Sequence, residues 1–163
     1  MASEPHRLYP PTRFTQMCEL YWPKYYNDCS GFVKAVAEKN GVFLSGNAND
    51  IVQYTSNSWT CLANGIEAAN AASKGKFVIA GLAATTGHGH VVIVVPGQPA
   101  NGRYPCAYWG TLHEMTFDLG GRKFTINGGV GRRHQTINWA WQQDVLPHVI
   151  YRAAEPSKLL RGF

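Results

Sequence analysis

The stretch N-D-C-S-G-F-V at residues 27–33 sets a cysteine where polar turn residues give way to an apolar helix. Apolar residues then recur at helical spacing until a stop signal at Asn40-Gly41, and Asp28 or Asn27 is expected to cap the helix. Backbone N–H groups and the helix dipole favour an anion at such a position, so the sequence predicts a lowered pKa for Cys29 and a reactive thiolate. The alternative is a buried structural cysteine.

Length and composition indicate one domain that spans residues 1–163. The chain has 163 residues, 45% of them hydrophobic, which is enough for one core and too short for two ordinary domains. It has no internal repeat and no hydrophobic run long enough for a membrane span, so no membrane insertion is expected. The segment Met1 to Pro11 lacks the apolar region of a signal peptide. The sequence therefore predicts a protein made in the cytoplasm and, if it acts outside, exported by another route.

The net charge of +5 suits an anionic polymer, which could be nucleic acid, a membrane surface or an acidic cell-wall glycan. The basic residues are scattered, and their closest cluster, Arg132-Arg133-His134, carries no nucleic-acid-binding signature, so no nucleic-acid partner is expected. Four cysteines are too sparse for a disulfide scaffold but leave room for one bridge among Cys18, Cys61 and Cys106.

The order of elements predicts an α+β domain. Beyond the first helix, helices are expected over residues 47–58 and 62–74, and strands over 77–82, 90–95, 104–112, 115–119, 123–127 and 145–152. Helices followed by strands favour helices packed on one face of an antiparallel sheet. The Gly-rich stretches 120–123 and 128–133 are interpreted as solvated loops, with a loop over the substrate groove as the alternative. Trp139 and Trp141 are interpreted as packing residues on one side of a strand.

The second candidate functional residue is a histidine at the start of a strand. The stretch G-H-G-H at residues 87–90 leads directly into a Val-rich strand, which puts His90 at the strand start. A cysteine at a helix start and a histidine at a strand start are how a Cys–His pair meets in papain-like folds. Two alternatives are zinc bound by His88, His90, Cys29 and Cys106, and a structural role for His90. We expect neither a metal nor a cofactor.

These motifs resemble a known family. N-D-C-S-G-F-V at 27–33 and G-H-V-V-I-V-V from Gly89 look like the cysteine and histidine motifs of NlpC-type papain-like peptidases. G-N-A-N at 46–49, S-W-T-C-L-A-N-G at 58–65 and F-V-I-A-G-L at 77–82 resemble the first amidase family of type VI secretion effectors. The resemblance covers residues 27 to about 110 well and the C-terminal third poorly.

The resemblance implies a papain-like NlpC-type fold and a peptidoglycan amidase activity. Enzymes of this family hydrolyse the γ-D-glutamyl–meso-diaminopimelate bond of peptidoglycan stem peptides. The producing cell injects them through a secretion apparatus into the periplasm of a rival, and a cognate immunity protein blocks the active site. The basic charge and the N-terminus without a signal peptide fit that route.

The sequence departs from the family where a third group usually orients the histidine. Trp109 occupies the aligned position, and an indole cannot accept the imidazole N–H. A backbone carbonyl, Tyr108, Thr111 or His113 could serve instead, so the third member stays open.

The expected mechanism is nucleophilic attack by the Cys29 thiolate, with His90 protonating the leaving amine and then activating water. The Cys29 backbone N–H would hold the oxyanion, with Ser30 helping to close the helix N-terminus. Asp28, Asn47 and Asn49 are candidate substrate contacts, and helix capping explains them equally well. The alternatives from other classes are a silent module that binds cell-wall peptide and an acyltransferase that uses the same dyad.

Overall fold

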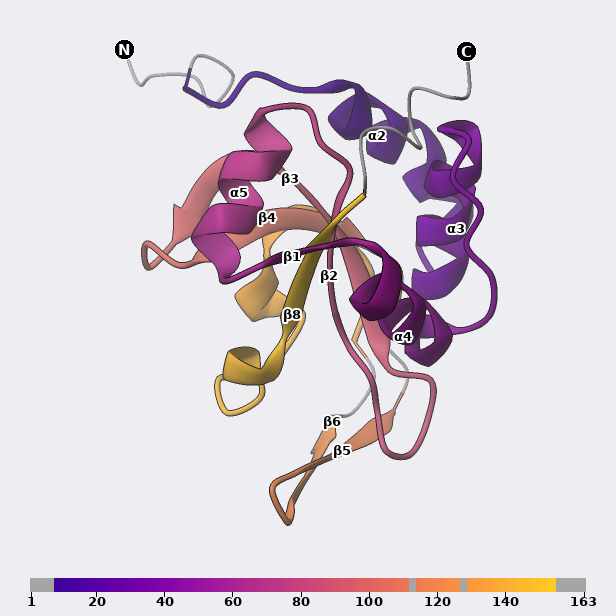
Figure 1. Cartoon of the computed structure of the whole chain (residues 1–163), viewed down its shortest axis with the longest axis vertical. Helices are drawn as coiled ribbons and strands as arrows, with labels where there is room; N and C mark the ends of the chain where they lie inside the picture. The colour runs from indigo at the N-terminus through magenta and orange to yellow at the C-terminus, as the bar shows by residue number, and fades with distance from the viewer. Residues whose placement is uncertain (1–7, 112–113, 127–128, 155–163) are drawn as a thin grey trace.

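A six-stranded antiparallel sheet forms the centre of the computed structural model, which describes residues 8–111, 114–126 and 129–154. In spatial order its strands are β1 (Thr60–Leu62), β8 (Ile150–Ala153), β2 (Val78–Leu82), β3 (His90–Ala100), β4 (Tyr104–Trp109) and β7 (Arg132–Thr136) (Figure 1). The buried central strands are β2, β3 and β4, whose β-branched and aromatic residues suit a sheet covered on both sides.

Among the described residues, four helices pack on this sheet, each begun by a side chain that accepts a backbone N–H of its first turn. They are α2 (Arg13–Tyr25), α3 (Cys29–Lys39), α4 (Ala48–Ser58) and α5 (Gly65–Ser73), capped by Thr12, Asp28, Asn47 and Asn64. The sequence did not predict α2 as a separate helix, because Pro23 interrupts its pattern. Its polar residues and its proline are accommodated because Phe14 and Cys18 anchor it to the sheet.

The two faces of the sheet carry separate hydrophobic clusters. On β3, Val91, Ile93 and Val95 belong to the cluster beneath α2, α3 and α4, which we call the α3 face. Val92 and Val94 belong to the cluster beneath α5, which we call the α5 face. Figure 1 shows α5 on the opposite side of the sheet from α3. The predicted α+β class with helices on an antiparallel sheet is confirmed, but the expectation that all helices share one face is wrong for α5.

The remaining elements complete the α5 face or project from the sheet. The β5 (Met115–Leu119) and β6 (Arg122–Ile126) strands form a separate hairpin that extends away from the main sheet (Figure 1). Two 3₁₀ turns, η1 (Ile137–Trp139) and η2 (Leu146–His148), follow β7. The residues from Arg132 onward form a strand rather than the predicted loop, because β4 supplies a pairing edge that no local pattern reveals.

The last two tryptophans correct another sequence interpretation. Trp139 ends η1 and is 61% exposed, with the Arg132 guanidinium 4.9 Å from its ring centroid. Trp141 is buried on the α5 face. They therefore do not share one side of a strand, and only Trp141 is a packing residue.

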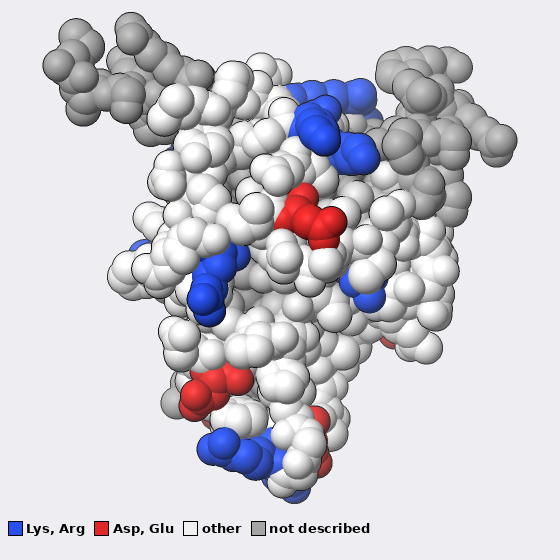
Figure 2. Space-filling model, turned by 60° about the vertical axis from the view of Figure 1, so that its left-hand side comes forward, with Lys and Arg blue, Asp and Glu red and all other residues white. Residues whose placement is uncertain are grey.

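The charges are dispersed, in keeping with the scattered basic residues of the sequence. Figure 2 shows the Lys and Arg side chains of one face in separate groups divided by uncharged surface, with acidic groups between them. Within the described residues, no helix is long and apolar enough to cross a membrane. The N-terminal expectation about a signal peptide falls largely on residues 1–7, outside the described residues.

Candidate active site

Cys29 is the first residue of α3, as the sequence predicted, and its local contacts fix the helix start. Asp28 Oδ1 accepts the Gly31 N–H at 3.0 Å and the Ser30 hydroxyl at 3.3 Å. Asp28 and Ser30 are therefore engaged in capping, which satisfies one donor of the first turn. The cysteine itself is 7% exposed and lies in the cluster of the α3 face.

The turn before Cys29 is attached to the end of β4. The Thr111 backbone N–H and hydroxyl both donate to the Tyr26 carbonyl, at 2.7 and 3.0 Å. Trp22 Nε1 donates to the Trp109 carbonyl at 3.0 Å. Gly110 fits because it has no side chain: a Cβ there would lie 2.7 Å from the Asp28 carbonyl oxygen. These contacts hold the N-terminus of α3 where β4 ends.

The predicted lowering of the Cys29 pKa is wrong in direction. Burial raises the pKa of this thiol, and the nearby Asp28 carboxylate raises it further, while hydrogen bonds from the backbone of Val91, Ser30 and Cys29 itself lower it. The N–H groups of the helix start act as expected, but desolvation outweighs them. The resting thiol is therefore held more strongly protonated than a free cysteine.

The Val91 backbone N–H lies near enough to the Cys29 thiol to lower its pKa. Val91 follows His90 on β3. The pairing of β3 with β4 extends no further in this direction than Ile93 with Tyr108. Cys29 thus lies near the start of β3, beyond its pairing with β4.

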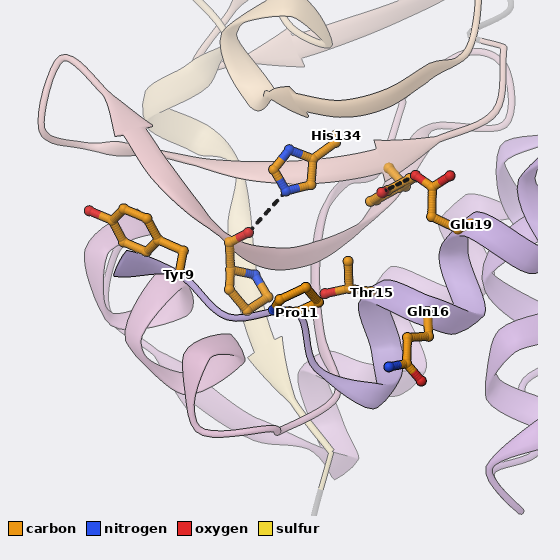
Figure 3. Close-up of a pocket in the computed structure, with 8 residues that line it drawn as sticks. Tyr9, Pro11, Thr15, Gln16, Glu19 and His134 are labelled. Atoms are coloured by element: carbon orange, nitrogen blue, oxygen red, sulfur yellow. Dashed lines mark hydrogen bonds between the residues drawn. The ribbon is translucent and has the colours of Figure 1, made fainter. Parts of the chain in front are cut away.

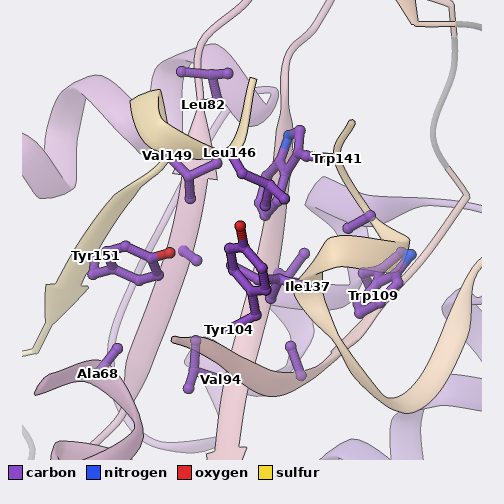
Figure 4. Close-up of a cluster of buried hydrophobic side chains, with 14 of the residues drawn as sticks. Ala68, Leu82, Val94, Tyr104, Trp109, Ile137, Trp141, Leu146, Val149 and Tyr151 are labelled. Carbon is purple, nitrogen blue, oxygen red and sulfur yellow. The ribbon is translucent and has the colours of Figure 1, made fainter. Parts of the chain in front are cut away.

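His90 begins β3, also as predicted, and is fully buried. Its ring meets Trp141 edge-on at 5.2 Å between centroids and Trp109 at 6.5 Å. Figure 4 shows these two indoles within the α5-face cluster, with Ile137 close to Trp109. The imidazole therefore lies on the α5 face of the sheet, whereas Cys29 belongs to the cluster of the α3 face. Sequence spacing gave no sign of Trp141, which comes 51 residues after His90 and outside any strand.

Asn47 and Asn49 bind the loop that leads into His90. Asn47 caps α4, and its amide nitrogen lies 3.1 Å from His88 Nδ1. The amide of Asn49 bonds three backbone groups of residues 84–87. Both side chains predicted as substrate contacts are thus engaged with protein groups.

The structure shows how the candidates for the group that orients His90 are engaged. Tyr108 donates its hydroxyl to Glu19 on the α3 face, and that bond together with burial raises the pKa of the phenol. Thr111 donates its hydroxyl to the Tyr26 carbonyl. The Trp109 ring lies edge-on to His90, at 6.5 Å between centroids. His113 lies outside the described residues, as does Gly128 of the Gly-rich stretch.

The zinc and disulfide alternatives receive no support. In the described parts of the chain, no three His, Cys, Asp or Glu side chains are grouped to hold a metal ion. Cys106 contacts the Gln98 carbonyl at 3.5 Å, and all four cysteines, each of which is described, are free.

Two cavities lie on the side of the sheet that carries α2 and α3. One, of about 680 Å³, lies between α2 and β7 (Figure 3). It is lined by Tyr9, Pro11, Thr15, Gln16, Glu19, Pro96, Tyr108 and His134. Figure 3 shows His134 directed at the Pro96 carbonyl, which it contacts at 3.1 Å, and Glu19 is already paired with Arg133. The second, of about 450 Å³, borders the first turn of α3 at Gly31, with Lys34, Ser45 and Gly46 in its walls.

The sequence is similar to a characterised protein. It is 42% identical over 103 residues to "Peptidoglycan amidase Tse1" of Pseudomonas aeruginosa strain PAO1. The aligned region covers 58% of this chain and 66% of the relative, just under two thirds of its length. No known protein-family profile matches the chain. The similarity confirms the resemblance inferred from the motifs.

Proposed function

We propose that this protein is a peptidoglycan amidase in which Cys29 is the nucleophile and His90 the general acid and base. The observation that carries the proposal is the similarity to a peptidoglycan amidase, 42% over 103 residues. The contact between Cys29 and the backbone of Val91 supports it, because it puts the thiol beside the residue that follows His90. A cysteine at a helix start next to a histidine is the arrangement that acyl transfer requires.

The raised pKa of Cys29 decides how the thiol is activated. Because burial keeps the proton on sulfur, His90 removes it as the sulfur attacks the amide carbonyl, rather than holding a preformed ion pair. A C–S bond forms, the C–N bond breaks, and His90 returns the proton to the departing amine. Water then enters, His90 takes its proton, and hydrolysis of the thioester releases the carboxylate product and the free thiol.

The oxyanion of each tetrahedral intermediate is bound by the Cys29 backbone N–H at the start of α3. This donor has no carbonyl partner within its own helix, since the first N–H groups of any helix lack one. Ser30 contributes indirectly, because its hydroxyl bond to Asp28 steadies the cap that sets the direction of these N–H groups.

The bond cleaved is that between γ-D-glutamate and meso-diaminopimelate in the stem peptide. We further propose that the protein is an antibacterial effector, carried by a secretion apparatus into the periplasm of a target cell and restrained in kin by an immunity protein. These finer statements rest on the resemblance of residues 27 to about 110 to the amidase effectors.

The test is digestion of Gram-negative peptidoglycan by the wild type, Cys29→Ser and Cys61→Ser, with the soluble products identified by mass spectrometry. The wild type and Cys61→Ser, which alters an exposed thiol, should release D-glutamate-terminated fragments at equal rates. Cys29→Ser should be slower by about a thousand-fold or more, because a hydroxyl is far harder to activate.

Other products would decide against the proposal. Cleavage at a different bond would refute the assignment of the substrate bond but keep the amidase. Binding of peptidoglycan without any release would indicate a cell-wall-binding module, and a new peptide adduct would indicate an acyltransferase.

A further inference from the structure

The amide of Asn49 binds the backbone of the loop between β2 and β3. Asn49 Nδ2 donates to the Ala84 carbonyl at 3.1 Å and to the Gly87 carbonyl at 3.0 Å. Its Oδ1 accepts the Ala84 N–H at 2.7 Å, and its own backbone N–H donates to the His88 carbonyl at 2.9 Å. Four hydrogen bonds thus tie this residue to the segment that ends at His90.

Asn49 does nothing comparable for its own helix. It is the second residue of α4, and the cap of that helix is Asn47, whose Oδ1 accepts the Asp50 N–H at 3.1 Å. An asparagine past the cap position is an unfavourable helix residue. The stabilisation that Asn49 provides is therefore directed to the loop.

The approach of Asn49 to the loop is close enough to restrict the residue before His90. Gly89 has φ of +73°, in the left-handed region, and a Cβ there would lie 2.3 Å from Asn49 Oδ1 and 2.8 Å from the Leu82 carbonyl. Leu82 is the residue paired with His90 across β2 and β3. Both the backbone angle and the space at position 89 require glycine.

The far side of the loop is held by the β5–β6 hairpin. The N–H groups of Thr85 and Thr86 donate to the Thr116 carbonyl at 2.9 and 3.1 Å, and the Thr116 N–H donates to the Thr86 carbonyl at 2.9 Å. The loop is therefore fixed between α4 and the β5–β6 hairpin. This fixes the direction in which the chain enters β3 at His90.

We propose that Asn49 is a positioning residue for His90 and does not contact substrate. Its amide sets the backbone of residues 84–89, and through it the orientation in which the imidazole meets the Cys29 thiol. This inference rests on the proposed function of Cys29 and His90. Proton transfer depends steeply on geometry, so loosening this loop slows thiol activation without removing a substrate contact.

The experiment measures the rate at which iodoacetamide alkylates Cys29 from pH 5 to 10, by peptide mass spectrometry, in the wild type, Asn49→Ala, His90→Ala and the double variant. At neutral pH, Asn49→Ala should react about ten- to a hundred-fold more slowly than the wild type, with the profile displaced towards alkaline pH. In the His90→Ala background the Asn49 substitution should have no further effect, because both act through one imidazole.

Kinetics on a purified stem peptide supply the second readout. Asn49→Ala should lower kcat and leave KM unchanged, and Asn49→Ser, which keeps one donor and one acceptor, should recover part of the rate. The matched control is Asn64→Ala, which removes the cap of α5, bonded to the Glu67 N–H at 2.9 Å, without touching the loop. If Asn49→Ala does not fold, Asn49→Asp, which keeps the acceptor for the Ala84 N–H and removes the two Nδ2 donors, tests the same contacts.

The outcomes separate this inference from the proposed function. A raised KM with an unchanged alkylation profile would make Asn49 a substrate contact and overturn the inference. An Asn49→Ala profile equal to that of the wild type, while His90→Ala differs, would also overturn it and leave the Cys29–His90 pair intact. Identical profiles for the wild type and His90→Ala would refute the pair itself and the proposed mechanism with it.

Discussion

The two faces of the sheet hold the two candidate catalytic residues by different means. On the α3 face, Cys29 is placed by a helix start: a capping carboxylate, backbone N–H groups and a turn bonded to the end of β4. On the α5 face, His90 is placed by a loop bonded to Asn49 and by the edges of two indole rings. The thiol is thus placed mainly by backbone groups and the imidazole by side chains of other elements.

If Cys29 and His90 form the proposed pair, the two faces restrict where they can meet. A strand directs neighbouring side chains to opposite faces, so a residue on the α3 face and one on the α5 face are separated by β3 along most of its length. The pairing of β3 with β4 extends only to Ile93, and the Cys29 thiol lies near Val91, beyond that pairing. The proposed pair therefore depends on where β4 ends.

The largest expected effect in a test of this comparison comes from Trp141. Trp141→Ala removes a buried ring from the α5 face and should lower the free energy of unfolding by about 3–5 kcal/mol. Because the ring also contacts His90 at 5.2 Å, the variant should slow alkylation of Cys29 at neutral pH. Denaturant unfolding and the alkylation profile measure the two effects separately.

Ile137→Ala is the matched control for that variant. Ile137 is fully buried in the same cluster, and its loss should cost about 2–5 kcal/mol. If Ile137→Ala changed the alkylation profile as much as Trp141→Ala, the indole would have no particular part in holding His90. The inferred difference in how the two faces position Cys29 and His90 would then be smaller.

A smaller effect is expected from the thiols of the α3 face at alkaline pH. Burial raises the pKa of Cys106 from 9.0 to about 11, and burial also raises the pKa of Cys18 and Cys29. Since the folded pKa lies above the unfolded value, this stabilisation is fully present below pH 9 and is lost as the pH rises through about 11. Cys106 alone should contribute a slope of about −1.4 kcal/mol per pH unit in that window.

Unfolding of the wild type and Cys106→Ala in urea between pH 7 and 11 measures this slope. Cys106→Ala should be less stable at pH 7, because a buried atom is lost, but should lose stability less steeply above pH 9. Cys61→Ala, which removes an exposed thiol, is the control. Parallel curves for the wild type and Cys106→Ala would show that the Cys106 thiol is not the source of the alkaline sensitivity.

The sequence predicted the α3 side of the site better than the α5 side. Capping residues and helical spacing lie within a few positions of Cys29, so the helix start and its cap could be inferred from the local pattern. The strand starting at His90 was equally clear, because a Val-rich run is typical of a buried strand. The partners of His90 were not, since Trp141 comes 51 residues later in the chain and contacts His90 only in the tertiary fold.

The wrong expectations share a physical cause, which is long-range burial. The pKa of Cys29 was expected to fall because a sequence displays the helix start but not the desolvation that raises the pKa. Strand β7 was missed because its pairing with β4 depends on contacts across 23 or more positions. Helix α5 was assigned to the wrong face because the crossover through β1 cannot be read from helical spacing.

We expect the smallest effect from Tyr108→Phe. This variant tests whether a residue of the α3 face supplies a third catalytic group. The Tyr108 hydroxyl donates to Glu19, whose pKa is lowered, although burial acts to raise it, by hydrogen bonds from Tyr108 and Arg133. Removing the hydroxyl leaves Glu19 paired with Arg133, so the cost should be about 1 kcal/mol of unfolding free energy. Because the hydroxyl serves the α3 face and not His90, kcat and KM on a stem peptide should stay at wild-type values. A fall of ten-fold or more in kcat, with folding intact, would instead make Tyr108 the group that orients His90. A residue of the α3 face would then act on the imidazole of the α5 face, and the two residues would not be held by separate faces.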